Sequence, residues 1–84
     1  MVMIIIFFIT NNVTSMSKIF LNATNFNKNI NNWNTSNVTN MRSMFCCAKN
    51  FNQPLNCWNT NNINDMRYMF IGSSMPKLPN WYNN

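Results

Sequence analysis

Apolar residues recur along the chain with the spacing of an amphipathic helix. Met41, Met44, Phe45 and Ala48 lie at i, i+3, i+4 and i+7, which places them on one face of two helical turns. Two further segments have the same or nearly the same spacing: Met16, Ile19, Phe20 and Ala23, and Met66, Met69, Phe70 and Ser73. The pattern predicts a brief helix in each segment.

Between these segments the hydrophobic period shortens. "NVTNM" at 37–41 and "NINDM" at 62–66 are short, partly β-branched alternations, and this pattern favours a strand. "FNKNI" at 26–30 and "FNQPL" at 51–55 have large apolar ends. Pro54 disfavours helix there and biases the preceding residue toward extended backbone. Each unit is therefore predicted to be a short strand, a turn, a second short strand and a brief helix.

These units follow one another as a 25-residue repeat. "WNTSNVTNMRSMF" at 33–45 and "WNTNNINDMRYMF" at 58–70 share eight of thirteen positions. Like residues that coincide at this spacing are predicted to stack and bury one another. These predicted ladders comprise Met16, Met41 and Met66; Phe20, Phe45 and Phe70; Val13, Val38 and Ile63; and Trp33 and Trp58.

The predicted fold class is a repeat solenoid of leucine-rich-repeat type, with short parallel strands and one short helix in each 25-residue coil. Residues 1–84 are predicted to form one repeat domain, with coils at approximately 8–32, 33–57 and 58–82. Asn residues at matching turn positions can tolerate left-handed backbone. They are compatible with ladders between coils and equally with solvent-exposed turns.

The repeat resembles that of the BspA-like leucine-rich-repeat surface proteins, in the variety named from mycoplasma lipoproteins. Residues 41–66, "MRSMFCCAKNFNQPLNCWNTNNINDM", carry the motif almost in full, and residues 10–41 carry a second copy with "FNKNI" in place of "FNQPL". The resemblance implies surface display and adhesion or host interaction. Arg42 and Arg67 depart from it, because the repeat commonly has Ser there.

The opening "MVMIIIFFI", residues 1–9, is charge-free. It is too short for the roughly 20 residues that span a bilayer, and it lacks the basic start and small-residue cleavage site of a convincing signal peptide. Its register fits a degenerate first coil. A signal or membrane-tethering segment is the alternative interpretation, so contact with a membrane through residues 1–9 stays open. A location at the cell surface or outside the cell follows only from the family resemblance.

Composition argues against catalysis. The chain has no His, one acidic residue and one Gly, whereas acid–base catalysis needs titratable groups near the working pH. We therefore expect no enzyme activity, no cofactor and no metal site. Cys46, Cys47 and Cys57 show no zinc-type spacing and are expected to be small apolar fillers.

The chain carries a net charge of +5, but its cations are too dispersed for a nucleic-acid-binding tract, so nucleic acid is an unlikely partner. Arg42 and Arg67 lie one repeat apart, with Lys18 offset by one position. This row predicts a binding site for an anionic partner, such as an acidic protein, a glycan or a lipid head group. The alternative is a solvated face that keeps the chain soluble.

The sequence as a whole predicts a non-enzymatic protein that mediates protein or cell-surface interaction. Its partner is an unknown protein or surface ligand, and stacking with other repeat chains is a further possibility. The alternatives are a structural remnant of a longer repeat array and a membrane-tethered surface fragment.

Overall fold

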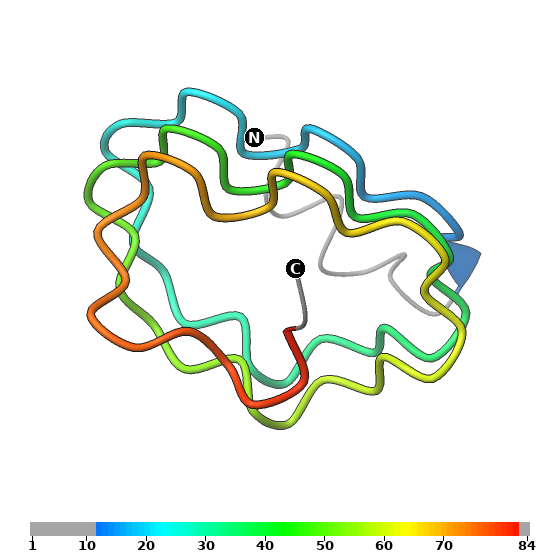
Figure 1. Ribbon diagram of the computed structural model, residues 1–84. Coiled ribbons are helices and arrows are strands. Elements are labelled where there is room, and N and C mark those ends of the chain that lie inside the picture. Colours follow the sequence, from blue (N-terminus) through cyan, green and yellow to red (C-terminus); the bar gives the residue numbers. More distant parts are fainter. Residues whose placement is uncertain (1–11, 83–84) are drawn as a thin grey trace.

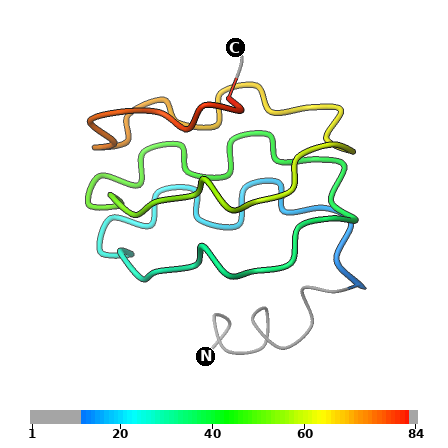
Figure 2. The ribbon, with the colours of Figure 1, turned by 90° about the horizontal axis from the view of Figure 1, so that it is seen from below.

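The chain winds through superposed turns, each about one sequence repeat long (Figure 1). The computed structural model describes residues 12–82, and the predictions for residues 1–9 lie outside this part. We call residues 12–32, 33–57 and 58–82 the first, second and third layers. Seen from the side, they lie one above another (Figure 2). Isolated parallel bridges join Ser15 to Asn40 and Asn40 to Asp65, so equivalent positions of the sequence repeat are in register between layers.

The predicted fold class is wrong. Residues 12–82 contain no α-helix, and their only β pairing consists of those isolated bridges. The molecule is a compact globule of 30 × 28 × 19 Å, built from turns and irregular backbone. A leucine-rich-repeat solenoid with parallel strands and a helix in each coil therefore does not describe it.

Left-handed residues explain why the predicted helices do not form. The backbone of Ser43 has a φ of 56° and that of Cys47 a φ of 62°, and a right-handed helix cannot continue through such residues. The amides of Met44 and Ala48 donate to the carbonyls three residues earlier, as in β-turns with positive φ at the third position. The other layers repeat this geometry at Lys18 and Asn22, and at Tyr68 and Gly72.

The amides between these turn bonds reach the next layer. Ser43 donates to Arg67, Phe45 to Met69 and Cys47 to Ile71, with N···O distances of 2.9, 2.9 and 2.7 Å. The first and second layers are joined in the same register by Met16 to Asn40, Lys18 to Arg42, Phe20 to Met44 and Asn22 to Cys46. Alternate amides thus bond within the turn and between layers, which satisfies backbone donors that a helix would have satisfied locally.

Ser43→Gly is expected to stabilise the protein. An L-residue in left-handed backbone costs about 1–2 kcal/mol, and the entropy cost of glycine, about 0.5–1 kcal/mol, offsets only part of that. We expect a gain of about 0.5 kcal/mol in the free energy of unfolding, measured by urea denaturation. Asn50→Gly is the control, because Asn50 is exposed and is not among the positive-φ residues; it should lower the stability. A loss of unfolding free energy in Ser43→Gly as large as that in Asn50→Gly would contradict this expectation.

Aromatic rings stacked from layer to layer fill the interior. The ring centroids of Trp33 and Trp58 are 6.5 Å apart, and the angle between the ring planes is 8°. The ring centroid of Phe45 lies 5.6 Å from that of Phe20 and 5.5 Å from that of Phe70. Met16, Met41 and Val38 are fully buried beside them. The remaining predicted ladder residues, Val13, Ile63 and Met66, are partly buried against this core.

The last residues of the third layer pack against its earlier ones. The Trp81 ring stacks 6.2 Å from that of Trp58, and the Tyr82 ring meets Phe70 edge-on at 5.0 Å. The Trp81 Nε1 donates to the carbonyl of Leu55 at 2.8 Å, and the Trp58 Nε1 donates to that of Ile30 at 2.9 Å. Each indole therefore contributes both apolar area and a hydrogen bond to a carbonyl of an earlier layer.

Candidate interaction surface

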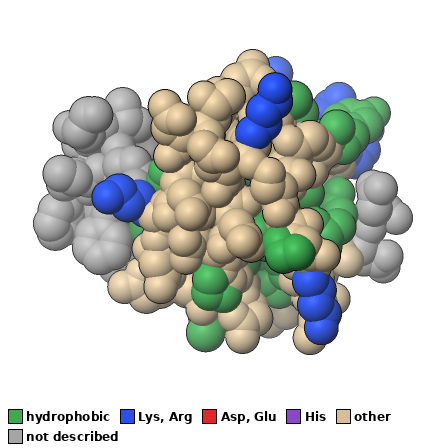
Figure 3. Space-filling model, turned by 90° about the vertical axis from the view of Figure 1, so that its left-hand side faces the viewer, with side chains coloured by type: hydrophobic (Ala, Val, Ile, Leu, Met, Phe, Trp, Pro, Cys, Tyr) green, Lys and Arg blue, Asp and Glu red, His purple; other side chains and the backbone are tan. Residues whose placement is uncertain are grey.

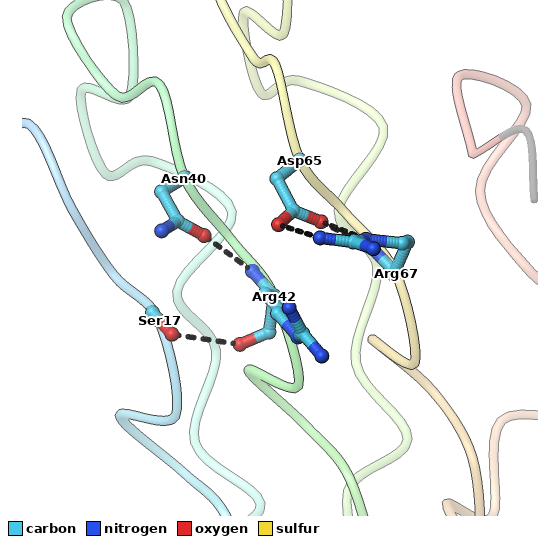
Figure 4. A network of polar contacts seen from close by, with 5 residues as sticks. All are labelled: Ser17, Asn40, Arg42, Asp65 and Arg67. Carbon is cyan, nitrogen blue, oxygen red and sulfur yellow. Dashed lines mark hydrogen bonds and ion pairs between the residues drawn. The ribbon is translucent and has the colours of Figure 1, made fainter.

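The predicted cationic row lies along the edge where the layers are bridged. Arg42 and Arg67 occupy the same position in successive layers, and the Ser43 amide donates to the carbonyl of Arg67. Ser17, not Lys18, is the equivalent residue of the first layer; its Oγ donates to the carbonyl of Arg42 at 3.2 Å (Figure 4). Lys18 occupies the next, left-handed position. The structure thus places the three cations on neighbouring turns but not in one register.

The Arg67 guanidinium is engaged by Asp65. Its Nε and Nη2 donate to the two carboxylate oxygens at 3.1 and 3.0 Å (Figure 4). Hydrogen bonds from the Arg67 side chain and from its backbone amide lower the pKa of Asp65 to about 2, and the charge of Arg42 adds to the effect. Because Asp65 is the only acidic residue in the chain, Arg67 is the one cation in the row whose charge an acidic side chain balances.

The Arg42 guanidinium lies over an aromatic ring of the next layer. Its Cζ is 5.3 Å from the centroid of Tyr68, within the distance at which cation–π attraction operates. Tyr68 is 46% exposed. Sequence comparison alone missed this residue, because the positions that match it are Lys18 and Ser43. Its signal would have been a large aromatic residue where the repeat is otherwise polar.

A polar side chain two residues earlier organises the backbone in each layer. The Asn40 Oδ1 accepts from the Arg42 amide at 2.9 Å, and the Asp65 Oδ1 accepts from the Arg67 amide at 3.1 Å (Figure 4). Ser15 accepts in the same way from Ser17 at 3.3 Å. These side-chain contacts mimic a backbone turn and fix the backbone conformation at Ser17, Arg42 and Arg67.

The Asp65–Arg67 pair predicts how stability depends on pH. The pKa of Asp65 lies near 2 in the folded protein, below its ordinary value of about 3.9 in an unfolded chain. The ionised form is favoured by folding, so this contribution is complete above about pH 5 and disappears as the pH falls through 4 toward 2. We expect the decline in the urea midpoint over this range to be smaller in Asp65→Asn.

Asp65→Asn is a well-matched change because Asn already occupies the equivalent position, 40, where it bonds the Arg42 amide. The variant can retain the backbone contact and lose only the charge. Urea midpoints at pH 7, 5, 4, 3 and 2 measure the effect. Parallel acid profiles for the two proteins would show that the ion pair contributes no pH dependence.

The Asn residues make both of the arrangements left open by the sequence. Asn31 Nδ2 donates across layers to Asn56 Oδ1 at 3.4 Å, whereas Asn59 Oδ1 accepts locally from the Asn61 amide at 3.0 Å. On the face shown in Figure 3, Lys and Arg are scattered among neutral polar groups and small apolar patches. No continuous basic tract is seen on that face.

The three cysteines are free thiols, with Cys46 and Cys47 partly buried and Cys57 exposed. Residues 12–82 contain no cluster of three or more His, Cys, Asp or Glu side chains that could hold a metal ion. Nor does this part of the chain contain a helix of the length and apolarity needed to cross a membrane.

The chain was compared with protein families, curated proteins and solved structures. A family model described as "Mycoplasma protein of unknown function, DUF285" matches residues 4–81. Neither the curated proteins nor the solved structures contain a match to the chain.

Proposed function

We propose that this chain, which belongs to the DUF285 family of mycoplasma proteins of unknown function, is a non-enzymatic interaction module that binds a protein at a cell surface. Its resemblance to the BspA-like surface proteins supports the location and the adhesion-type role. The proposed binding surface consists of Lys18, Arg42, Arg67 and Tyr68, and we call it the Arg42 surface.

The stacked pair of Arg42 and Tyr68 carries this proposal. Arg and Tyr are among the residues that most often dominate the energy of protein interfaces. Here the guanidinium is held over the ring, 5.3 Å from its centroid, and the ring remains nearly half exposed. A pair that is already ordered loses less conformational entropy when a partner binds.

The charge of the chain supports an acidic partner in this proposal. The chain has six cations and one acid, and Asp65 is paired with Arg67. Arg42 and Lys18 have no ion-pair partner among residues 12–82. Such a surface attracts an acidic partner and orients its approach. We therefore assign an acidic protein segment to the Arg42 surface.

The scarcity of titratable side chains supports the non-enzymatic part of this proposal. The sequence has no His, and its single carboxylate is ionised and held by Arg67. General acid–base catalysis relies on a group that exchanges its proton near the working pH. The chain has no histidine to serve as the neighbouring base that activates a cysteine nucleophile.

The test uses the fluorescently labelled full chain and poly-L-glutamate as the acidic probe, at low and physiological salt. Arg42→Gln and Tyr68→Ala should each weaken binding about five- to tenfold, the range expected for an interface residue worth about 1 kcal/mol or more. Lys77→Gln removes the same charge from an exposed residue elsewhere and is the matched control. Equal losses in Lys77→Gln and Arg42→Gln, or no binding by the wild type, would refute the proposal. Heparin and anionic vesicles, tested in parallel, would instead reveal a glycan or lipid partner if they alone bind.

An open backbone edge favours a second candidate, self-association. The amides of Met41, Ser43, Phe45 and Cys47 donate to the third layer. The equivalent amides of the third layer are those of Met66, Tyr68, Phe70 and Gly72. They donate to no group within residues 12–82. An unpaired edge is a template for pairing with another chain. A second copy is the occupant we propose, because the equivalent carbonyls of the first layer, those of Ser15, Ser17, Ile19 and Leu21, accept from no amide within residues 12–82 and lie at matching positions of the repeat.

Sedimentation velocity over a hundredfold range of concentration tests self-association. The wild type should shift toward a larger species as its concentration rises. Ile71→Lys places a charge beside the open edge at a side chain that is 56% exposed, and it should suppress the shift. Leu78→Lys, at another exposed apolar residue of the third layer, is the control. A single monomeric species at all concentrations would exclude this candidate.

A further inference from the structure

Two adjacent thiols converge at one point on the middle layer. Cys46 and Cys47 are both partly exposed and both free, and their Sγ atoms lie 3.7 Å apart. The repeat has no cysteine at the matching positions, which are Leu21 and Asn22 in the first layer and Ile71 and Gly72 in the third. The pair is therefore a local feature of the second layer and not part of the periodic core.

Contacts with both neighbouring layers hold this pair in place. The Asn22 amide donates to the carbonyl of Cys46 at 2.9 Å, and the Cys47 amide donates to the carbonyl of Ile71 at 2.7 Å. The Cys47 backbone is left-handed, with a φ of 62°. The backbone that carries the two thiols is thus fixed from above and below.

The glycine beside the pair leaves room for the second thiol. A Cβ at Gly72 would lie only 3.2 Å from the Cys47 Sγ. Gly72 is the only glycine in the sequence. The one position of the third layer without a side chain is therefore the position that faces Cys47. The Cys47 thiol occupies space that a side chain at 72 would otherwise crowd.

The two thiols are poorly placed to form a disulfide with each other. The peptide bond between them is trans, so their Cα atoms are about 3.8 Å apart, whereas disulfides usually join Cα atoms about 4.4–6.8 Å apart. Burial, followed by the hydrogen bond with Cys47, raises the pKa of the Cys46 thiol, which keeps it protonated at neutral pH. The stable form of the pair is therefore a dithiol.

We propose that Cys46 and Cys47 form a bidentate binding site for a soft trivalent metalloid, of which an organic arsenic(III) oxide is the simplest representative. Soft acceptors prefer sulfur ligands. A tetrahedral metal such as zinc needs four ligands, and no cluster of three or more suitable side chains exists within residues 12–82. An acceptor that needs only two thiolates fits the pair.

The reaction balances without an oxidant or a reductant. The As=O group of the reagent takes the two thiol protons and leaves as one water molecule. Two As–S bonds form, to Cys46 and Cys47, while arsenic remains trivalent and both sulfurs keep their oxidation state. The second bond forms within the molecule once the first thiol is attached, so the pair gains from a high effective concentration.

Phenylarsine oxide is the probe, added to the reduced full chain and followed by intact mass and thiol titration. The wild type should take up one equivalent with loss of one water and consumption of two of its three thiols. Cys57→Ser should behave like the wild type. Cys46→Ser and Cys47→Ser should each need about a hundredfold more reagent for half-saturation, because the intramolecular second bond is lost. The wild-type adduct should resist excess monothiol and be removed by a small dithiol.

Three results would overturn the proposal: equal affinity in the wild type and in Cys46→Ser, loss of the adduct in Cys57→Ser, or removal of the wild-type adduct by monothiol. Each variant is first shown to melt cooperatively by tryptophan fluorescence. If Cys47→Ser does not fold, Cys46→Ser alone decides the outcome, because the one-to-one adduct requires both thiols.

Discussion

Phe45→Ala should cost about 4 kcal/mol of unfolding free energy, in the range of about 3–5 kcal/mol measured when a buried Phe is truncated. Phe45 is fully buried. Its ring lies 4.3 Å from that of Phe51 and 5.5 Å from that of Phe70, and it also meets Phe20 and Trp58. Truncation therefore leaves a cavity that touches all three layers. Those rings belong to hydrogen-bonded layers that cannot easily close over it.

The change is large compared with the stability of so small a protein. At about 0.05–0.15 kcal/mol per residue, the chain has roughly 4–13 kcal/mol in total. Urea denaturation followed by tryptophan fluorescence measures the loss. Tyr68→Ala removes a ring of similar size from a side chain that is 46% exposed and should cost no more than about 1 kcal/mol. If Phe45→Ala cost no more than this control, the stacked interior would not be the main source of stability.

Gly72→Val should be the second most damaging substitution, with an expected loss of about 3 kcal/mol. Gly72 has a φ of 75°, where an L-residue costs about 1–2 kcal/mol and a β-branched one more. Its new Cβ would lie 3.3 Å from the Cα of Cys47. That backbone cannot retreat without stretching the bond from the Cys47 amide to Ile71, so crowding adds to the strain.

Asn22→Val separates the two effects in Gly72→Val. Asn22 occupies the equivalent position of the first layer, with a φ of 59°, and it is exposed. Because Asn22 already bears part of the left-handed strain, the control should suffer only the added strain of a β-branched residue and none of the crowding, so its loss should be at most about half as large. Thermal and urea unfolding of both variants measure the difference. Equal losses would show that contact with Cys47 contributes nothing.

The local pattern was ambiguous in a way that explains the wrong helix prediction. Met41, Met44, Phe45 and Ala48 have helical spacing, but they are also the first and last residues of two consecutive four-residue turns, 41–44 and 45–48. A helix and this pair of turns would bury the same four side chains. Five of the six left-handed positions among residues 12–82 carry residues other than glycine, so the usual sequence signal for positive φ was absent.

The candidate surface was only partly visible in the sequence. The repeat identified Arg42 and Arg67 as equivalent, because they occupy the same place in two successive copies of it. It could not reveal that Asp65 holds Arg67 or that Arg42 lies over Tyr68. The second contact joins side chains from two different layers, and it depends on the direction in which each side chain leaves its turn.

The amino-acid sequence by itself determined the periodicity of the chain and the scarcity of catalytic groups, because these are properties of residue identity and order. Only the tertiary structure decided what each repeat is made of. Alternate amides donate to the adjacent layer, and these bonds compensate left-handed backbone that would be unfavourable in an isolated segment. Since the partners of these bonds, such as Ser43 and Arg67, belong to different copies of the repeat, no local pattern could have shown whether a turn or a helix would prevail.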